Sequence, residues 1–163
     1  MTQPPEIARD EALWRALVDR ERGFYAARAD FMSGAADRVA VLRSALRSVA
    51  ERGTALRVLP ILPLAERQAL FEDLVRLASV GHADVQLVRD AIGSLPREWT
   101  VARLEGTAEP LLRDATDEEY RRLLELYVAM DVGITRRLAE RASRHADEHV
   151  REVGQDFLVR LSA

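Results

Sequence analysis

GHADVQLVRDAIGSL at residues 81–95 and RHADEHVREVGQDFL at residues 144–158 are two versions of one phrase. Each opens with His-Ala-Asp and continues with apolar residues at helical spacing. An aspartate at the start of a helix accepts hydrogen bonds from the first free N–H groups and complements the positive end of the helix dipole. The two segments therefore predict equivalent helices, with Asp84 and Asp147 as their N-caps.

The likeness extends beyond these two helices. The residues before each His-Ala-Asp also correspond, and a middle copy has the same pattern around Asp117. The three aspartates are about 30 to 33 residues apart, which is the length of a unit of two helices. Ala91 and Gly154 occupy one position of the repeat, where a small residue would let the preceding helix pack closely. The sequence predicts repeated helical hairpins that bury their apolar faces against one another.

The rest of the chain also reads as helical, because apolar residues recur at helical spacing and no segment alternates over a sustained stretch. We expect a first helix after Pro4-Pro5 that ends at Gly34, and a second over residues 37–52 that Gly53 closes. Pro60 and Pro63 predict a buried, irregular connector over residues 54–63, with a short edge strand as the alternative. After it we expect one helix from about Leu64 to Gly81 and a helix over residues 98–113 that Gly106 and Pro110 bend. Thr116 and Glu119 match a capping box at the start of the helix that follows. Trp14 and Trp99 are expected in the core, with Trp99 at a junction between repeats. The predicted fold class is all-α, with about seven or eight helices judged from the segments in which apolar residues recur at helical spacing.

The second helix of each unit is similar to that of the HEAT-like repeat family, in its short bacterial form. The matching residues are Asp147, Val150, Arg151 and Gly154, in part Asp117, Tyr120 and Arg121, and also Asp84 and Leu87, although Val88 stands where arginine is expected. The resemblance implies an α-solenoid of stacked antiparallel hairpins, with repeats at 64–96, 97–131 and 132–163. Residues 1–53 would be a capping hairpin or a divergent repeat within a single domain over 1–163. A non-repetitive helical bundle is the alternative.

Composition excludes several kinds of chemistry. The chain has no Cys, Lys or Asn, and all of its 24 basic residues are arginine, a bias typical of a GC-rich genome. Thiol chemistry, a Schiff-base lysine and a phosphate-loop lysine are thereby excluded. The formal charge of −3 disfavours nucleic-acid binding through overall charge. No signal-peptide pattern and no membrane-length apolar run is present, so we expect a cytoplasmic protein without membrane contact.

No motif for catalysis, a metal or a cofactor emerges from the sequence. His145 and His149 are four residues apart, but Asp147 between them is the expected start of a helix, so they should not share a ligand face. The paired carboxylates fall mostly at helix starts, where they complement the dipole. There is no glycine-rich phosphate loop and no Gly-x-Ser-x-Gly motif. We therefore predict a protein that is not an enzyme and has no catalytic residue, metal or cofactor.

Architecture then favours a scaffold, adaptor or inhibitor (immunity-type) protein that binds another protein on a concave surface lined by the second helices. Candidate contacts on those helices are Arg89, Arg121, Glu125 and Arg151. A further set lies on one predicted helix: Arg136, Arg137, Arg141 and Arg144. Glu140 lies four residues from both Arg136 and Arg144, so ion pairing within the helix is one interpretation of this set, and a patch that binds an acidic partner, a phosphate or a nucleic acid is the other. A nucleic-acid-binding helical repeat and an enzyme with an unrecognised site are the alternatives, and a homodimer stays open.

Overall fold

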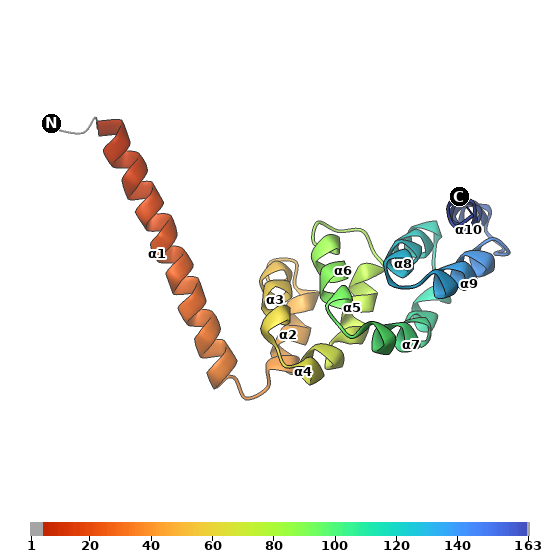
Figure 1. The fold of residues 1–163 in the computed structure, drawn as a ribbon, viewed down its shortest axis with the longest axis horizontal. Coiled ribbons are helices and arrows are strands. Elements are labelled where there is room, and N and C mark those ends of the chain that lie inside the picture. The colour runs from red at the N-terminus through yellow and green to blue at the C-terminus, as the bar shows by residue number, and fades with distance from the viewer. Residues whose placement is uncertain (1–4, 163) are drawn as a thin grey trace. The chain divides into compact units, whose positions relative to one another are not determined.

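The computed structural model describes residues 5–162, and every regular element in that part of the chain is helical (Figure 1). The prediction of an all-α protein is therefore confirmed, although the described residues form ten α-helices and not the expected seven or eight. The α-helices are α1 (Pro5–Gly34), α2 (Arg38–Arg47), α3 (Arg52–Val58), α4 (Leu64–Ala69), α5 (Phe71–Ala78), α6 (Val85–Gly93), α7 (Arg97–Ala108), α8 (Asp117–Met130), α9 (Val132–Ala142) and α10 (Glu148–Arg160). Two short 3-10 turns, η1 (Leu59–Ile61) and η2 (Glu109–Leu112), join them.

The chain divides into two compact units, unit 1 at residues 1–38 and unit 2 at residues 39–163. The described part of unit 1 consists almost wholly of α1, a continuous helix whose predicted end at Gly34 is confirmed. The expectation that Trp14 lies in the core is wrong, because its side chain is 65% exposed. The described residues of unit 1 include no second helix beyond the first residue of α2, so the unit itself does not cover Trp14.

The prediction of one helix over residues 37–52 is also wrong. α2 ends at Arg47 and α3 begins at Arg52, which leaves Val49 exposed and places Gly53 inside a helix. The Arg52 Nε–H donates to the carbonyl of Leu46 at 2.9 Å and so satisfies one of the free carbonyls at the end of α2. The turn redirects the chain, and α3 then packs against α6.

The segment 54–63 is more regular than the two prolines suggest. α3 continues to Val58, and Pro60 lies in the first turn of η1. Proline is tolerated in a first turn because its missing N–H would have no helical partner there. Leu59 and Leu62 are buried, so the expected burial of this segment is confirmed, while its irregularity is not.

In unit 2, consecutive helices touch at α4–α5, α5–α6, α7–α8, α8–α9 and α9–α10, and the pairs α5–α6, α7–α8 and α9–α10 among them are the ones that the sequence predicts as hairpins. The second helices of these pairs also touch, since α8 contacts both α6 and α10. The helix expected after Leu64 is divided into α4 and α5 at the fully buried Leu70. The bend expected near Pro110 is confirmed, because α7 ends at Ala108 and continues as η2. Trp99 packs edge-on against Phe71 at 5.1 Å between ring centroids, which joins α7 to α5.

The three aspartates of the repeat differ in what they do. Asp147 caps α10 as predicted, accepting from the backbone N–H of His149 at 2.8 Å. Asp84 stands at the N-cap of α6 but makes no capping hydrogen bond. Asp117 is the first residue inside α8, and the cap is Thr116, through the capping box that the sequence predicts. The common cap role therefore holds for Asp147 alone.

Other parts of the repeat are equivalent in detail. The Nδ1 atoms of His82 and His145 each accept from the backbone N–H of the aspartate two residues later, both at 3.1 Å. The close approach expected at Gly154 is confirmed, because a Cβ there would lie 2.3 Å from the backbone nitrogen of Ser143 and 2.7 Å from the carbonyl oxygen of Ala139. α9 and α10 therefore pack backbone to backbone at this point.

Candidate functional site

The surface formed by α6, α8 and α10, called here the α6–α8–α10 surface, is hollowed in two places. A pocket of about 560 Å³ between α6 and α8 is lined by Gln86, Arg89, Asp90, Gly93, Ser94, Glu125, Ala129 and Met130. A second pocket of about 260 Å³ between α8 and α10 is lined by Glu125, Val128, Phe157, Arg160 and Leu161. Glu125 lines both pockets and so lies at the centre of the surface.

Two arginines converge on the Glu125 carboxylate. Arg89 of α6 donates to Glu125 Oε2, and Arg122 of α8 donates to the same oxygen at 3.2 Å. Burial acts to raise the pKa of Glu125, but the hydrogen bonds and charges of Arg89 and Arg122 outweigh it and hold the pKa below its usual range. Asp90 lines the same pocket, so the two arginine charges lie beside two carboxylates there.

The arginines of this cluster also retain unused hydrogen-bonding capacity. The Nε–H groups of Arg89 and Arg122 are buried and have no hydrogen-bond partner among the residues that the structure describes. Arginine presents five N–H donors in a fixed planar arrangement, and Glu125 accepts from only some of them. The two unpartnered Nε–H groups are buried, so a bound partner would meet the terminal N–H groups of these arginines instead.

The pocket between α8 and α10 is the more apolar of the two. Val128 is 49% exposed at its rim, and the buried Phe157 ring carries the Arg160 guanidinium 5.1 Å from its centroid. Arg121 of α8 approaches Asp156 of α10, with 4.0 Å between Nη1 and Oδ2. This end of the surface combines an exposed aliphatic side chain with a cation held over an aromatic ring.

The predicted site residues on the second helices divide into two groups. Arg89 and Glu125 line the α6–α8–α10 surface, and Arg121 pairs across it with Asp156. Arg151 has a different role, because its Nη1 donates to the carbonyls of His145 at 3.0 Å and Ala146 at 2.7 Å. The guanidinium of Arg151 thus stabilises the turn before α10. Arg122 is the one residue of the cluster around Glu125 that the sequence interpretation missed.

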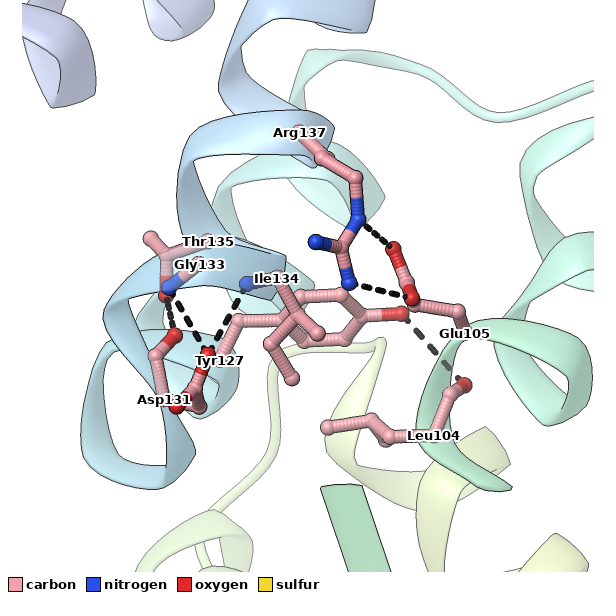
Figure 2. Close-up of polar contacts among 8 residues, drawn as sticks. All are labelled: Leu104, Glu105, Tyr127, Asp131, Gly133, Ile134, Thr135 and Arg137. Carbon is pink, nitrogen blue, oxygen red and sulfur yellow. Dashed lines mark hydrogen bonds and ion pairs between the residues drawn. The ribbon is translucent and has the colours of Figure 1, made fainter. Parts of the chain in front are cut away.

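Two of the four arginines expected as a patch on α9 are engaged by other helices. Arg137 forms a two-pronged pair with Glu105 of α7, through Nε at 2.8 Å and Nη2 at 2.7 Å (Figure 2). Arg141 donates to Glu109 of η2 at 2.5 Å. These hydrogen bonds lower the pKa of both glutamates, against the effect of their partial burial. The local pairing expected within α9, of Glu140 with Arg136 and Arg144, is wrong, because none of these three side chains forms an ion pair with a residue that the structure describes.

The other two arginines of that helix, Arg136 and Arg144, are exposed, and neither forms an ion pair with a residue that the structure describes. They lie eight residues apart along the chain and flank the engaged pair. The predicted patch is thus reduced from four arginines to two that stay available at its ends.

A polar cluster that the sequence interpretation missed joins α7, α8 and α9 (Figure 2). The buried Tyr127 hydroxyl donates to the carbonyl of Leu104 at 3.4 Å, and burial raises the pKa of this phenol well above its usual range. Asp131 caps α9 by accepting from the N–H groups of Gly133 at 2.7 Å and Ile134 at 3.1 Å. The aspartate before Val132-Gly133 was a usable signal for this cap. The cluster is structural, since each contact joins two helices or caps one.

The described residues bring no set of three or more His, Cys, Asp or Glu side chains together in a way that could hold a metal ion. Across the same residues, no helix combines the length and the apolar character that crossing a bilayer requires. Comparison with protein-family models, with curated proteins and with solved structures found no match to this chain.

Proposed function

We propose that this chain is a non-catalytic protein-interaction module that holds a segment of another protein on the α6–α8–α10 surface. The observation that carries the proposal is the meeting of two pockets at Glu125, where Arg89 and Arg122 converge. Contacts of α8 with both α6 and α10 support a stack of helical hairpins, the HEAT-like arrangement that the sequence resembles. Hairpin stacks commonly use the surface of their second helices for binding.

The chemistry of the surface defines the kind of segment that fits. Arg89 and Arg122 have more N–H donors than Glu125 accepts from, so an acidic side chain or a backbone carbonyl of the partner would accept from those that remain. Val128 and Phe157 in the neighbouring pocket suit an apolar side chain. A partner segment with a carboxylate next to an apolar residue matches both pockets. Arginine and aromatic groups of this kind contribute most of the binding energy in many interfaces.

A substitution that fills the pocket between α6 and α8 tests the proposal. Ala129 lines this pocket and is exposed, so Ala129→Trp should fill it and leave α8 folded. Ala102→Trp on α7 is the matched control, because Ala102 is also an exposed helical alanine and lines neither pocket. Each full-length variant is used to capture proteins from extracts of the native host, with quantification by mass spectrometry.

The expected result is a protein captured by the wild type and by Ala102→Trp, with at least a tenfold loss on Ala129→Trp. Direct titration of that purified protein should then give the same ranking. A partner retained equally by both variants would overturn the assignment of this surface. Circular dichroism of both variants shows that any loss is not a loss of folding.

Nucleic-acid binding is less favoured by the contacts on α9. Arg137 and Arg141 already face carboxylates, so they would release few counterions on meeting a phosphate backbone. Titration with labelled single-stranded RNA and duplex DNA at low salt tests this alternative. Binding that weakens steeply with salt and is lost on replacing Arg136 and Arg144 would favour it over a protein partner.

A further inference from the structure

A coiled-coil pattern runs along α1, the helix of unit 1. Alternating spacings of three and four residues, the a/d pattern of a heptad repeat, place one set of residues on a single helix face. This set, called here the α1 seam, is Ile7, Asp10, Trp14, Leu17, Glu21, Phe24, Arg28 and Phe31. Most of the seam is large and apolar, but charged residues interrupt it at three positions.

The apolar part of the seam is uncovered within its own unit. Trp14 is 65% exposed, Leu17 57% and Phe24 40%, and Leu13 and Tyr25 beside the seam are exposed as well. A single helix in water is only marginally stable, and most helical stability in proteins comes from packing an apolar face. An apolar stripe about 36 Å long, at 1.5 Å per residue from Ile7 to Phe31, therefore indicates a helix that needs a partner.

The charged seam residues select the orientation of a second α1. A parallel, in-register pair would place Asp10 against Asp10, Glu21 against Glu21 and Arg28 against Arg28. In an antiparallel pair centred on Asp19, each a residue faces a d residue of the other helix, and Asp10 faces Arg28 twice. The other layers are Ile7 with Phe31, Trp14 with Phe24, and Leu17 with Glu21. The antiparallel pair thus converts two like-charge layers into two opposite-charge layers.

The register is also specific. Sliding one helix by a heptad would face Asp10 with Glu21 in one direction, and Arg28 with Leu17 in the other, and both shifts leave end residues of the seam without a layer. Only the pairing centred on Asp19 uses every seam position and matches every charge of Asp10 and Arg28. Charge complementarity and the number of layers agree on one arrangement.

The side chains of α1 are disposed for this pairing. The Arg28 guanidinium lies 4.8 Å from the Tyr25 ring centroid and 5.8 Å from that of Phe24, which holds the cation on the seam side of the helix. Asp10 forms no ion pair with any residue that the structure describes, so it is available to a second chain. The Tyr25 hydroxyl donates to Glu21 at 3.5 Å, which draws the Glu21 carboxylate towards the edge of the seam.

We propose that α1 pairs with α1 of a second copy of this chain as an antiparallel two-stranded coiled coil centred on Asp19, in which Asp10–Arg28 pairs fix the orientation. The inference rests on unit 1 alone and is independent of the partner surface on unit 2. A dimer of this kind carries two copies of unit 2, which would raise the apparent affinity for a partner with more than one binding segment.

Charge reversal tests both the dimer and its orientation. Asp10→Arg and Arg28→Asp each put like charges into two layers, and each should raise the dimer dissociation constant of the full chain at least tenfold in sedimentation equilibrium. The double variant Asp10→Arg/Arg28→Asp restores opposite charges and should return to within about threefold of the wild type. In a parallel dimer each of these charges already faces its own copy, so neither single reversal should weaken it, and unchanged single variants would contradict the antiparallel arrangement. A wild-type chain that stays monomeric at high micromolar concentration would overturn the proposal.

Cysteine crosslinking tests the orientation directly, because the natural chain contains no cysteine. Ile7→Cys and Phe31→Cys chains carrying tags of different size are oxidised alone and as a mixture. The mixture should give a disulfide-linked dimer of one chain of each kind, and neither variant alone should crosslink efficiently. Efficient crosslinking of each variant with itself would show a parallel pair instead. Helicity by circular dichroism controls for folding in all variants.

Discussion

α1 and α8 show how similar apolar content leads to different fates. α8 buries Tyr120, Leu123, Leu124, Leu126, Tyr127 and Met130 against helices of its own unit. α1 has comparable residues, including Leu13 and Trp14, yet they are exposed. The difference lies in the neighbours, since the described part of unit 1 supplies no helix to pack on α1. Apolar residues at helical spacing predict that a face will be buried, but not by which chain.

The largest contrast is expected from removing one leucine in each region. Leu124→Ala in α8 should destabilise unit 2 by about 3 kcal/mol, because a fully buried leucine loses its contacts and leaves a cavity. Leu13→Ala in α1 should change the free energy of unfolding by less than about 0.5 kcal/mol, because that side chain is 61% exposed. Urea denaturation followed by circular dichroism measures both. A large loss from Leu13→Ala would show that this side chain is covered in solution, by unit 2 or by a second α1.

Glycine-to-alanine exchanges should differ in sign between the two units. Gly154→Ala should cost roughly 2 kcal/mol, because the new Cβ would meet backbone atoms of α9 that cannot move aside easily. Gly23→Ala should stabilise α1 by about 0.5 to 1 kcal/mol, since nothing lies within 4 Å of its new Cβ and alanine is the better helix former. Thermal melts of the two variants give the comparison. Equal effects would contradict the packing difference.

Within unit 2, the two aspartates of the His-Ala-Asp phrase should also differ. Asp147→Ala should cost about 1 kcal/mol, because it removes hydrogen bonds to two free N–H groups of α10. Asp84→Ala should lower the free energy of unfolding by only a few tenths of a kcal/mol, because Asp84 makes no capping hydrogen bond. Equilibrium denaturation of both variants measures the two losses of stability. Neither exchange should alter dimerisation through α1, and a change in the dimer constant would link the two units.

The smallest effect is expected from the pH dependence of the central carboxylate. Because the pKa of Glu125 is lowered in the folded chain, its contribution to stability is complete above the unfolded pKa, near 4.3, and is lost as the pH falls through the lower folded value. Glu125→Gln should remove up to about 1 kcal/mol at pH 7 and flatten the stability profile below pH 5. In the Arg89→Gln background the same exchange should cost less. An unchanged profile would contradict the ion cluster.

The sequence predicted those parts of the molecule that depend on near neighbours in the chain. The end of α1 at Gly34, the capping box at Thr116, the bend at Pro110 and the cap at Asp147 were all predicted correctly, because each rests on a few adjacent residues. The division between α2 and α3 was missed, since Arg52 and the packing of α3 on α6 decide it.

The candidate site was predicted only in part, for the same reason. Arg89 and Glu125 could be placed on outward faces of their helices, and their meeting depends on how α6 packs against α8. The pairs of Arg137 with Glu105 and Arg141 with Glu109 join residues more than thirty positions apart, so the helix pattern could not reveal them. That pattern offered only Glu140, as a local partner of Arg136 and Arg144. Helical spacing shows which residues share a face, but not what that face meets.

By itself, the sequence determined that this chain is all-α, without thiol or lysine chemistry, and that its repeated phrase reserves a small residue where two helices touch. Those properties follow from composition, from the period of the apolar residues and from local capping. Only the tertiary structure decided that Asp147 caps while Asp84 does not, that two pockets meet at Glu125, and that α1 lacks a cover within its own unit. These features depend on contacts between segments that are distant in the sequence, and no local stretch of residues determines the free energy of such contacts.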